Sequence, residues 1–247
     1  MIDYLEQIID ATSVEDVWLS HCDKMASFGF DRLLYGFTRF RTATSFGDRE
    51  DFLIMTNHTG DYAETFINGG LYFHAPMVNW AVRNNGACSW AWWAQNTAML
   101  SESEKKVVAF NIAHGVTAGY SISFRDASIR NKGAIALTAE RGMTQDIVEE
   151  VWKEHGRDIT VMNNVVHLKL IQLPYSTPAR HLTKRQCEAL EWMRDGKTTQ
   201  DAAEIMGLTA ATVEKHLRLA REALDVETTA QAVLKASFQN QIFVLER

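Results

Sequence analysis

Three cations lie at three-residue intervals near the C-terminal end of the sequence and could contact nucleic acid. Lys215, Arg218 and Arg221 would share the exposed side of one helix. The opposite side would be apolar, formed by Val213, Leu217, Ala220 and Leu224. Cations placed in this way can bind phosphates or donate paired hydrogen bonds to base edges. Because acids share their side of the helix, charge alone favours the solvated face of a small helical bundle.

Capping residues delimit the elements that must position these cations. Thr183 begins a first predicted helix, and three more begin at Thr198 or Thr199, at Thr209, and at Thr228 or Thr229. The link "MGLT", at residues 206 to 209, predicts the tight turn of a helix-turn-helix, which favours DNA binding. We expect Lys215 and Arg218 to contact bases, with Arg221 on the same face. The residues expected at phosphates are Lys197, Thr198, Thr199 and Thr212.

Aromatic side chains upstream could form an apolar binding site. They gather between residues 62 and 95, in "LYFHAPMVNW" and "CSWAWWAQ" among other stretches. Tyr62 and Phe66 stand one helical turn apart and should project from one face. Trp90 and Trp92 would alternate with Trp93 on a predicted strand. Taken alone, such a cluster is more often plain core, and the other interpretation is the wall of a pocket for an apolar ligand.

The distribution of charge indicates two domains. The net charge is −6, and residues 177 to 247 hold ten Lys/Arg and ten Asp/Glu, so the acidic excess lies in residues 1 to 176. An acidic part would repel a polyanion, whereas a neutral part can present a local basic face. Two prolines, Pro174 and Pro178, mark a break between the two parts. We therefore predict a small-molecule-binding domain at 1–173, a linker at 174–182 and a DNA-binding domain at 183–247.

Strand and helix patterns alternate before the linker. Five strands are predicted within residues 31–40, 51–57, 86–94, 115–124 and 132–140. Helices are predicted at 60–69, 76–84, 101–114 and 144–172, with another opened by Ser13. The fold class expected is an α+β, α-β-α sandwich with about five antiparallel strands flanked by helices. An all-α, four-helix helix-turn-helix domain should follow it.

Several classes of protein are disfavoured. No apolar run approaches the ~20 residues that span a bilayer, and the N-terminus lacks the basic region of a secretory signal. Cys22, Cys88 and Cys187 show neither a pairing pattern nor metal-ligand spacing, which indicates reduced thiols in a cytoplasm and no metal site. An enzyme using Cys88 or Ser121 as nucleophile has no supporting motif, so we expect no catalytic residue and no cofactor.

The C-terminal segment resembles the DNA-binding domain of LuxR-type transcriptional regulators. It shares Leu182, Thr183, Arg185, Glu188, Leu190, Trp192, Gly196, Lys197 and Thr198 with that pattern. It also shares Ala203, Gly207, Thr212, Val213, His216 and the later "QAVLKA". The departures, Gln186 for Glu and Thr209 for Ser, keep a hydrogen-bonding group. The resemblance implies that the fourth helix helps two such domains to form a homodimer on double-stranded DNA.

With that domain behind it, the N-terminal region resembles the autoinducer-binding domain of quorum-sensing LuxR regulators. Members of that family bind an acyl-homoserine lactone between the sheet and the helices. Aligning Pro76 with the family's Asp-Pro pair places Ala75 at the acid. The residues implied at the ligand are then Tyr62, Phe66, Ala75, Trp90, Ser121, Ala136 and Thr138.

These departures bear on the signal. The family's Asp accepts a hydrogen bond from the lactone amide, and Ala75 removes that charged bond, worth ~1.5–3 kcal/mol. Phe66 and Ala136 make the wall less polar as well. The resemblance implies a cytoplasmic transcriptional regulator controlled by an apolar small molecule, such as an acyl-homoserine lactone or another apolar signal. The alternative is a LuxR-type DNA-binding regulator that needs no ligand or does not respond to lactones, and whose aromatic belt is structural core.

Overall fold

The computed structural model describes residues 1–42, 46–176 and 180–242, which form two compact units. The first unit comprises Met1–Gly47 and Leu53–Ile171. The second comprises Asp48–Phe52 and Gln172–Arg247. Part of the predicted linker, residues 177–179, lies outside the described residues.

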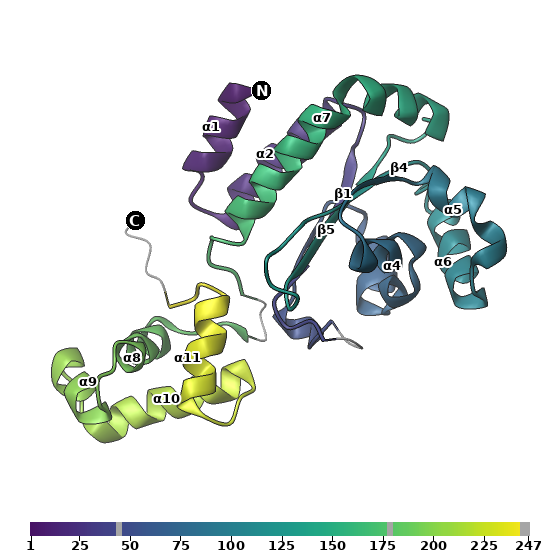
Figure 1. The fold of residues 1–247 in the computed structure, drawn as a ribbon. Helices are drawn as coiled ribbons and strands as arrows, with labels where there is room; N and C mark the ends of the chain where they lie inside the picture. Colours follow the sequence, from purple (N-terminus) through teal and green to yellow (C-terminus); the bar gives the residue numbers. More distant parts are fainter. Residues whose placement is uncertain (43–45, 177–179, 243–247) are drawn as a thin grey trace. The chain divides into compact units, whose positions relative to one another are not determined.

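The first unit contains a five-stranded antiparallel sheet in the order β2-β1-β5-β4-β3. The strands are β1 (Arg32–Thr38), β2 (Leu53–Thr56), β3 (Gly86–Ser89), β4 (Gly119–Ser123) and β5 (Lys132–Thr138). Helices α1, α2 and α7 lie on one side of this sheet, and α4 to α6 lie on the other (Figure 1). The predicted α-β-α sandwich is therefore confirmed.

Helical segments cover both faces of the sheet. Those before β3 are α1 (Ile2–Asp10), α2 (Val14–Ala26), the 3-10 turns η1 (Arg49–Asp51) and η3 (Leu71–His74), α3 (Gly60–Ala63), the π-helical η2 (Glu64–Asn68) and α4 (Pro76–Arg83). Those after it are α5 (Ala91–Gln95), the 3-10 turn η4 (Thr97–Met99), α6 (Glu102–Ala113) and α7 (Gln145–Leu170). Ser13 caps α2, as predicted, and Ser101 with Glu104 forms the capping box of α6.

Alternation along the strands gives the sheet two different faces. Leu33 and Tyr35 on β1 are fully buried, and the Tyr35 hydroxyl lies 2.8 Å from Nδ1 of His167 on α7. The neighbouring residue Leu34 pairs with Ala136 on β5, and both pack against an aromatic cluster on the other face. One face therefore forms the core with α7, and the other supports the candidate ligand site.

The strand predicted at 86–94 is wrong in its second half. Pairing with β4 ends at Ser89, Trp90 is the N-cap of α5, and Trp92 and Trp93 belong to that helix rather than alternating on a strand. The Ser89 hydroxyl accepts a hydrogen bond from the Ala91 backbone N–H at 3.0 Å, which turns the chain out of the ladder. The three indoles therefore follow a helical turn.

Two further features concern helices. Helix α7 is continuous through Gly156, where the absence of a side chain makes room for the indole of Trp152, which would otherwise lie 2.6 Å from a Cβ. Trp152 in turn stacks on Tyr120 of β4, with ring centroids 3.7 Å apart. Helix α1 went unrecognised because its N-cap, Met1, makes no side-chain capping bond, although Tyr4 and Ile8 are buried at helical spacing.

Among its described residues, the second unit contains four α-helices with the predicted starts. They are α8 (Lys184–Arg194), α9 (Thr199–Met206), α10 (Ala210–Leu224) and α11 (Thr229–Phe238). Their N-caps are Thr183, Thr198, Thr209 and Thr228, and each threonine accepts a backbone hydrogen bond from the first turn. Gly207 takes a left-handed conformation, φ 67°, between α9 and α10. The predicted helix-turn-helix domain is confirmed. No helix among the described residues is long and apolar enough to cross a membrane.

Candidate functional site

An aromatic cluster lies against the sheet face that carries Leu34, Ile54 and Ala136. Its buried members are Tyr62, Phe66, Ile67, Ala75, Trp90, Val107 and Val116. Partly buried side chains that pack against it include Tyr72, Trp93 and Phe110. The structure therefore brings together five of the seven residues expected at the ligand: Tyr62, Phe66, Ala75, Trp90 and Ala136.

Tyr62 stands at the centre of a stack of rings. Its ring centroid lies 4.4 Å from that of His58 and 5.2 Å from that of Phe66, and both pairs are nearly parallel. Phe110 packs on it from α6, with centroids 5.4 Å apart. The Tyr62 hydroxyl donates a hydrogen bond of 3.0 Å to Oδ1 of Asn111, and burial raises the pKa of this phenol. Tyr62 can therefore offer a neutral hydroxyl within apolar surroundings.

Trp90 and Ser121 form the second polar point of the site. The indole N–H of Trp90 donates to Oγ of Ser121 at 2.9 Å, and both side chains are buried. Ser121 on β4 is paired with Ala136 on β5, so the two share one face of the sheet. Gly119 permits the approach of the Trp90 ring, which would lie 3.1 Å from a Cβ at that position. Ser121 thus lies beside the cluster.

Thr138 lies on the same strand face as Ala136, beyond the cluster. Its Oγ1 is 3.4 Å from Nε2 of His58. Burial, and then the charge of Arg32, lowers the pKa of His58 to about 4, so this imidazole is neutral at pH 7. His58 and Asn111 were missed in the sequence. His58 precedes Tyr62 by the same four residues that separate Tyr62 from Phe66, and that spacing was the available signal.

Ala75 occupies the N-cap of α4, immediately before Pro76. It is 4 % exposed, and it supplies no side-chain acceptor to the first turn of the helix. An aspartate at an N-cap would accept backbone N–H bonds and would direct a carboxylate towards a bound polar group. With alanine, this point of the cluster is purely apolar.

The site shows no arrangement suited to covalent catalysis. Burial, and then the charge of Glu149, raises the pKa of the Cys88 thiol to about 11, so Cys88 is not a ready nucleophile. The Ser121 hydroxyl accepts the Trp90 hydrogen bond instead of facing a general base. Within the described residues, no three His, Cys, Asp or Glu side chains gather as a metal site.

In the second unit, α10 separates an apolar side from a charged side as predicted. Val213, Leu217, Ala220 and Leu224 are buried in the core of this unit. Lys215 and Arg218 are exposed on the opposite side. Arg218 forms an ion pair with Glu222, one helical turn away, so a base contact by Arg218 requires this exposed pair to open.

The remaining candidate DNA contacts differ in how exposed they are and in whether they already bind other side chains. Lys197 and Thr198 are exposed just before α9, and Thr199 is half-buried in its first turn. The Thr212 hydroxyl lies 2.8 Å from that of Thr209, and its backbone N–H is directed to the same cap. Arg221 donates to Thr229 at 2.8 Å and pairs with Glu214, so it ties α10 to α11 as well as lying on the charged side.

An α-β-α domain with an internal aromatic cluster, followed by a helix-turn-helix domain, defines a transcriptional regulator with a sensing domain. Residues 13–170 match the family described as autoinducer binding domain. Residues 180–236 match the family described as bacterial regulatory proteins, luxR family. The chain belongs to the LuxR-type, autoinducer-binding regulators, and it is accordingly a transcriptional regulator and not an enzyme.

Similar proteins share this organisation at low identity. The transcriptional activator LuxR of Aliivibrio fischeri is 22 % identical over 190 residues, covering 76 % of this chain and 74 % of that protein. The activator AnoR of Acinetobacter nosocomialis is 28 % identical over 148 residues, covering 58 % and 60 %. The crystal structure of Escherichia coli SdiA has a TM-score of 0.52 at 16 % identity and covers 97 % of this chain and 96 % of its own.

Two further solved structures with this fold are associated with a small molecule. SdiA in complex with octanoyl-rac-glycerol has a TM-score of 0.53 at 16 % identity, covering 98 % of this chain and 95 % of its own. The N-acylhomoserine lactone dependent LuxR family transcription factor CepR2 of Burkholderia cenocepacia has a TM-score of 0.52 at 16 % identity, covering 68 % and 92 %.

Proposed function

We propose that this regulator binds an apolar, uncharged signal in the aromatic cluster and that the signal controls its binding to DNA. The ligand contacts proposed are Tyr62, Phe66, Ala75, Trp90, Ser121, Ala136 and Thr138. Residues 1–173 would sense the signal and residues 183–247 would bind DNA, joined through 174–182. The observation that carries the proposal is a neutral, aromatic cluster in which Ala75 replaces the acid that the family uses to hold a lactone amide.

The signal proposed is an acylated small molecule whose recognition does not require a charged hydrogen bond. Solved structures with this fold include SdiA in complex with octanoyl-rac-glycerol and the N-acylhomoserine lactone dependent CepR2, which supports an acylated ligand. Without the acid, binding of a lactone would be weakened about ten- to a hundredfold relative to a site that contains it. A ligand without an amide would suffer no such penalty.

DNA binding is proposed through the charged side of α10. Lys215 and Arg218 would contact bases, with Arg221 beside them, while Lys197, Thr198, Thr199 and Thr212 would contact phosphates.

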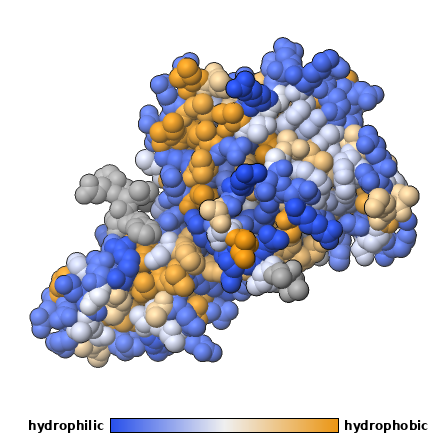
Figure 2. All heavy atoms as spheres, in the orientation of Figure 1, coloured by the Kyte–Doolittle hydropathy of each residue, from blue (hydrophilic) through white to orange (hydrophobic). Residues whose placement is uncertain are grey.

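We propose that the protein forms a homodimer in the cytoplasm. On α11, Leu234 and Phe238 are one turn apart and 55 % and 38 % exposed, which suits contact with a second copy. Apolar side chains also gather over α1 (Figure 2), where Ile2 and Ile9 are exposed.

Replacing Ala75 by Asp tests the ligand site. We expect Ala75→Asp to bind acyl-homoserine lactones about ten- to a hundredfold more tightly than the wild type, measured by calorimetry. Ala75→Asn is the matched control, because it has nearly the same shape without the charge and should gain less. If Ala75→Asp gained no lactone affinity over Ala75→Asn, the proposed position of the signal would be wrong.

A second candidate function is a ligand-independent regulator. The polar groups of the cluster are already bonded to each other, since Trp90 donates to Ser121 and Tyr62 donates to Asn111. Such pairs suit a core that is complete without a signal. Protein purified from a host that makes no lactones separates the candidates. A signal-controlled regulator should melt at a higher temperature when acyl lactones or acylglycerols are added, by the usual linkage of binding to folding, whereas a ligand-independent one should not.

A further inference from the structure

An acidic residue is buried in the second unit, on a segment that comes from a distant part of the sequence. Asp48–Phe52 lies between β1 and β2 in the chain but belongs to the second unit. Asp48 caps the 3-10 turn η1 by accepting a hydrogen bond from the backbone N–H of Glu50 at 3.0 Å. That turn ends at Asp51, which is 4 % exposed. A carboxylate buried to this degree requires partners.

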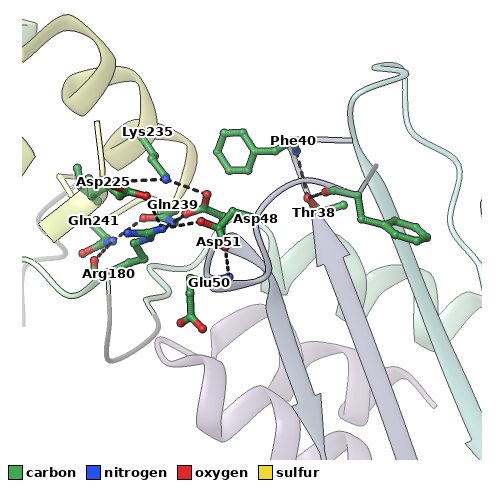
Figure 3. Close-up of polar contacts among 12 residues, drawn as sticks. Thr38, Phe40, Asp48, Glu50, Asp51, Arg180, Asp225, Lys235, Gln239 and Gln241 are labelled. Carbon is green, nitrogen blue, oxygen red and sulfur yellow. Dashed lines mark hydrogen bonds and ion pairs between the residues drawn. The ribbon is translucent and has the colours of Figure 1, made fainter. Parts of the chain in front are cut away.

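Lys235 of α11 is the first partner, and it links Asp51 to the end of α10. Its Nζ lies 2.8 Å from Oδ2 of Asp51 (Figure 3). The same ammonium donates a hydrogen bond of 2.8 Å to the backbone carbonyl of Leu224, the last residue of α10. A cation at this carbonyl satisfies a helix C-terminus that otherwise lacks a partner within the helix. Lys235 is itself buried, so its position depends on both acceptors.

Arg180 provides a second connection between the 48–52 segment and the C-terminal end of α10. Its Nη2 donates to Oδ2 of Asp48 at 2.7 Å and lies 3.4 Å from Oδ2 of Asp225, the left-handed C-cap of α10. Its Nε lies 3.4 Å from Oδ1 of Asp51, close enough for an ion pair. Gln239 also donates to that Oδ1, at 3.4 Å. Two cations therefore join the 48–52 segment to the C-terminal end of the helix that carries the candidate DNA contacts.

The same segment is directly continuous with the sheet of the sensing domain. Asp51 precedes Leu53, the first residue of β2, by two positions. The next residue, Ile54, packs against the aromatic cluster. Lys215 and Arg218 remain exposed, so the segment does not cover the candidate DNA contacts on α10.

We propose that Asp51 is a positioning residue for DNA binding: through Lys235 and Arg180 it fixes the C-terminal end of α10, and it makes that end responsive to β2. The inference rests on the proposed contact of α10 with DNA. A signal that shifts Ile54 of β2 at the aromatic cluster would move Asp51, three residues earlier in the chain. Asp51 would pass that shift to α10 through Lys235 and Arg180. Asp51 itself would touch neither DNA nor signal.

The test compares Asp51→Asn with Glu227→Gln in the full chain. The probe is a DNA duplex selected in vitro by the wild-type protein, and the dissociation constant is measured by fluorescence anisotropy at several salt concentrations. We expect Asp51→Asn to bind about tenfold more weakly, because a charged hydrogen bond that positions α10 is lost. Glu227 is an exposed acid just after α10, so Glu227→Gln removes one negative charge without touching the contacts of Asp51 and should stay within about twofold. The salt slope should not change, because no phosphate contact is removed.

The sign of the effect separates positioning from simple electrostatics. Removal of an acid should by itself strengthen binding to a polyanion. Unchanged or tighter binding by Asp51→Asn would therefore overturn the proposal, and recovery of wild-type affinity in Asp51→Glu would support it. Hydrogen exchange should also become faster in the last turn of α10. Unchanged exchange there would contradict the link through Lys235.

Two further variants keep the outcomes distinct. If Asp51→Asn does not fold, the charge-neutral Gln239→Met takes its place, since it removes one partner of Asp51. Weaker DNA binding by Gln239→Met would support the proposal, and wild-type affinity would overturn it. Arg218→Ala tests the DNA contact itself. If Arg218→Ala binds as tightly as the wild type, the proposed role of Arg218 is wrong; if it binds more weakly while Asp51→Asn does not, only the role of Asp51 is wrong.

Discussion

Two buried histidines and a partly buried one should make the sensing domain sensitive to mild acid. His21, His58 and His167 all belong to the first unit, and burial lowers the pKa of each to about 4. The surroundings of His21 show why it is neutral. The Tyr4 hydroxyl lies 2.7 Å from its Nδ1, and Oδ1 of Asn163 lies 3.0 Å from its Nε2. Asn163 in turn donates to the carbonyl of Ile159 at 2.8 Å. A neutral His21 ring accepts a hydrogen bond from the Tyr4 hydroxyl at Nδ1 and donates one to Asn163 from Nε2. This row of hydrogen bonds is therefore complete without a charge on the ring.

The direction of the effect follows from the pKa values. An unfolded histidine takes up a proton below its ordinary pKa of 6.5, whereas the folded protein resists protonation until about pH 4. Stability should therefore be present above pH 6.5 and fall as the pH is lowered towards 4. Between pH 7 and pH 5 each histidine lowers the free energy of unfolding by about 2 kcal/mol, and the three together lower it by about 5 kcal/mol. That loss is comparable to the whole stability of many domains, roughly 5–15 kcal/mol.

Urea unfolding at pH 7 and pH 5 measures this loss. His21→Gln should lower stability at pH 7 but should reduce the difference between the two pH values by about 2 kcal/mol, because one titrating group is gone. His155→Gln, which changes a ring that is 39 % exposed, is the control and should keep the full difference. A wild-type stability at pH 5 within about 1 kcal/mol of that at pH 7 would refute the reasoning.

Two further predictions, both tested by thermal unfolding, concern a glycine in a strand and a threonine that caps a helix. Gly119→Ala should destabilise the first unit by about 3 kcal/mol, because its Cβ would lie 2.1 Å from the Leu137 carbonyl oxygen. Gly36→Ala, with no atom within 4 Å of its Cβ, should cost less than about 1 kcal/mol in the same thermal unfolding experiment. Thr209→Ala should destabilise the second unit by about 1 kcal/mol, because it removes the acceptor for the Thr212 N–H. An unchanged melting temperature for Thr209→Ala would show that water replaces this cap.

The second unit was predictable because its signals are local. Each of its helices begins with a threonine that caps its own first turn, and Gly207 ends α9 by a conformation that glycine adopts freely. Such interactions span three or four residues, so the sequence displays them directly. The buried face of α10 followed from helical periodicity for the same reason.

The aromatic cluster was only partly predictable because its arrangement depends on contacts that are distant in the sequence. Tyr62 and Phe66 stack as their spacing suggested. The helix after Ser89 was missed, because Ser89 is held by Glu149 and by Gln145 of α7, about sixty residues away. His58 stands one helical turn before Tyr62, but its neighbours Thr138 and Arg32 are brought to it only by the pairing of β2 with β1 and of β1 with β5. Propensity gives no information about such long-range partners.

The placement of Asp48–Phe52 bears on how the chain is synthesised and divided. These residues leave the ribosome long before the helices of the second unit. The buried ion pair between Asp51 and Lys235 can therefore form only when the earlier part of the chain is present. A fragment that begins at residue 173 would contain all four helices but would leave the ammonium of Lys235 without Asp51. DNA-binding fragments prepared by removing the sensing domain should accordingly differ from the same helices in the intact protein at the end of α10.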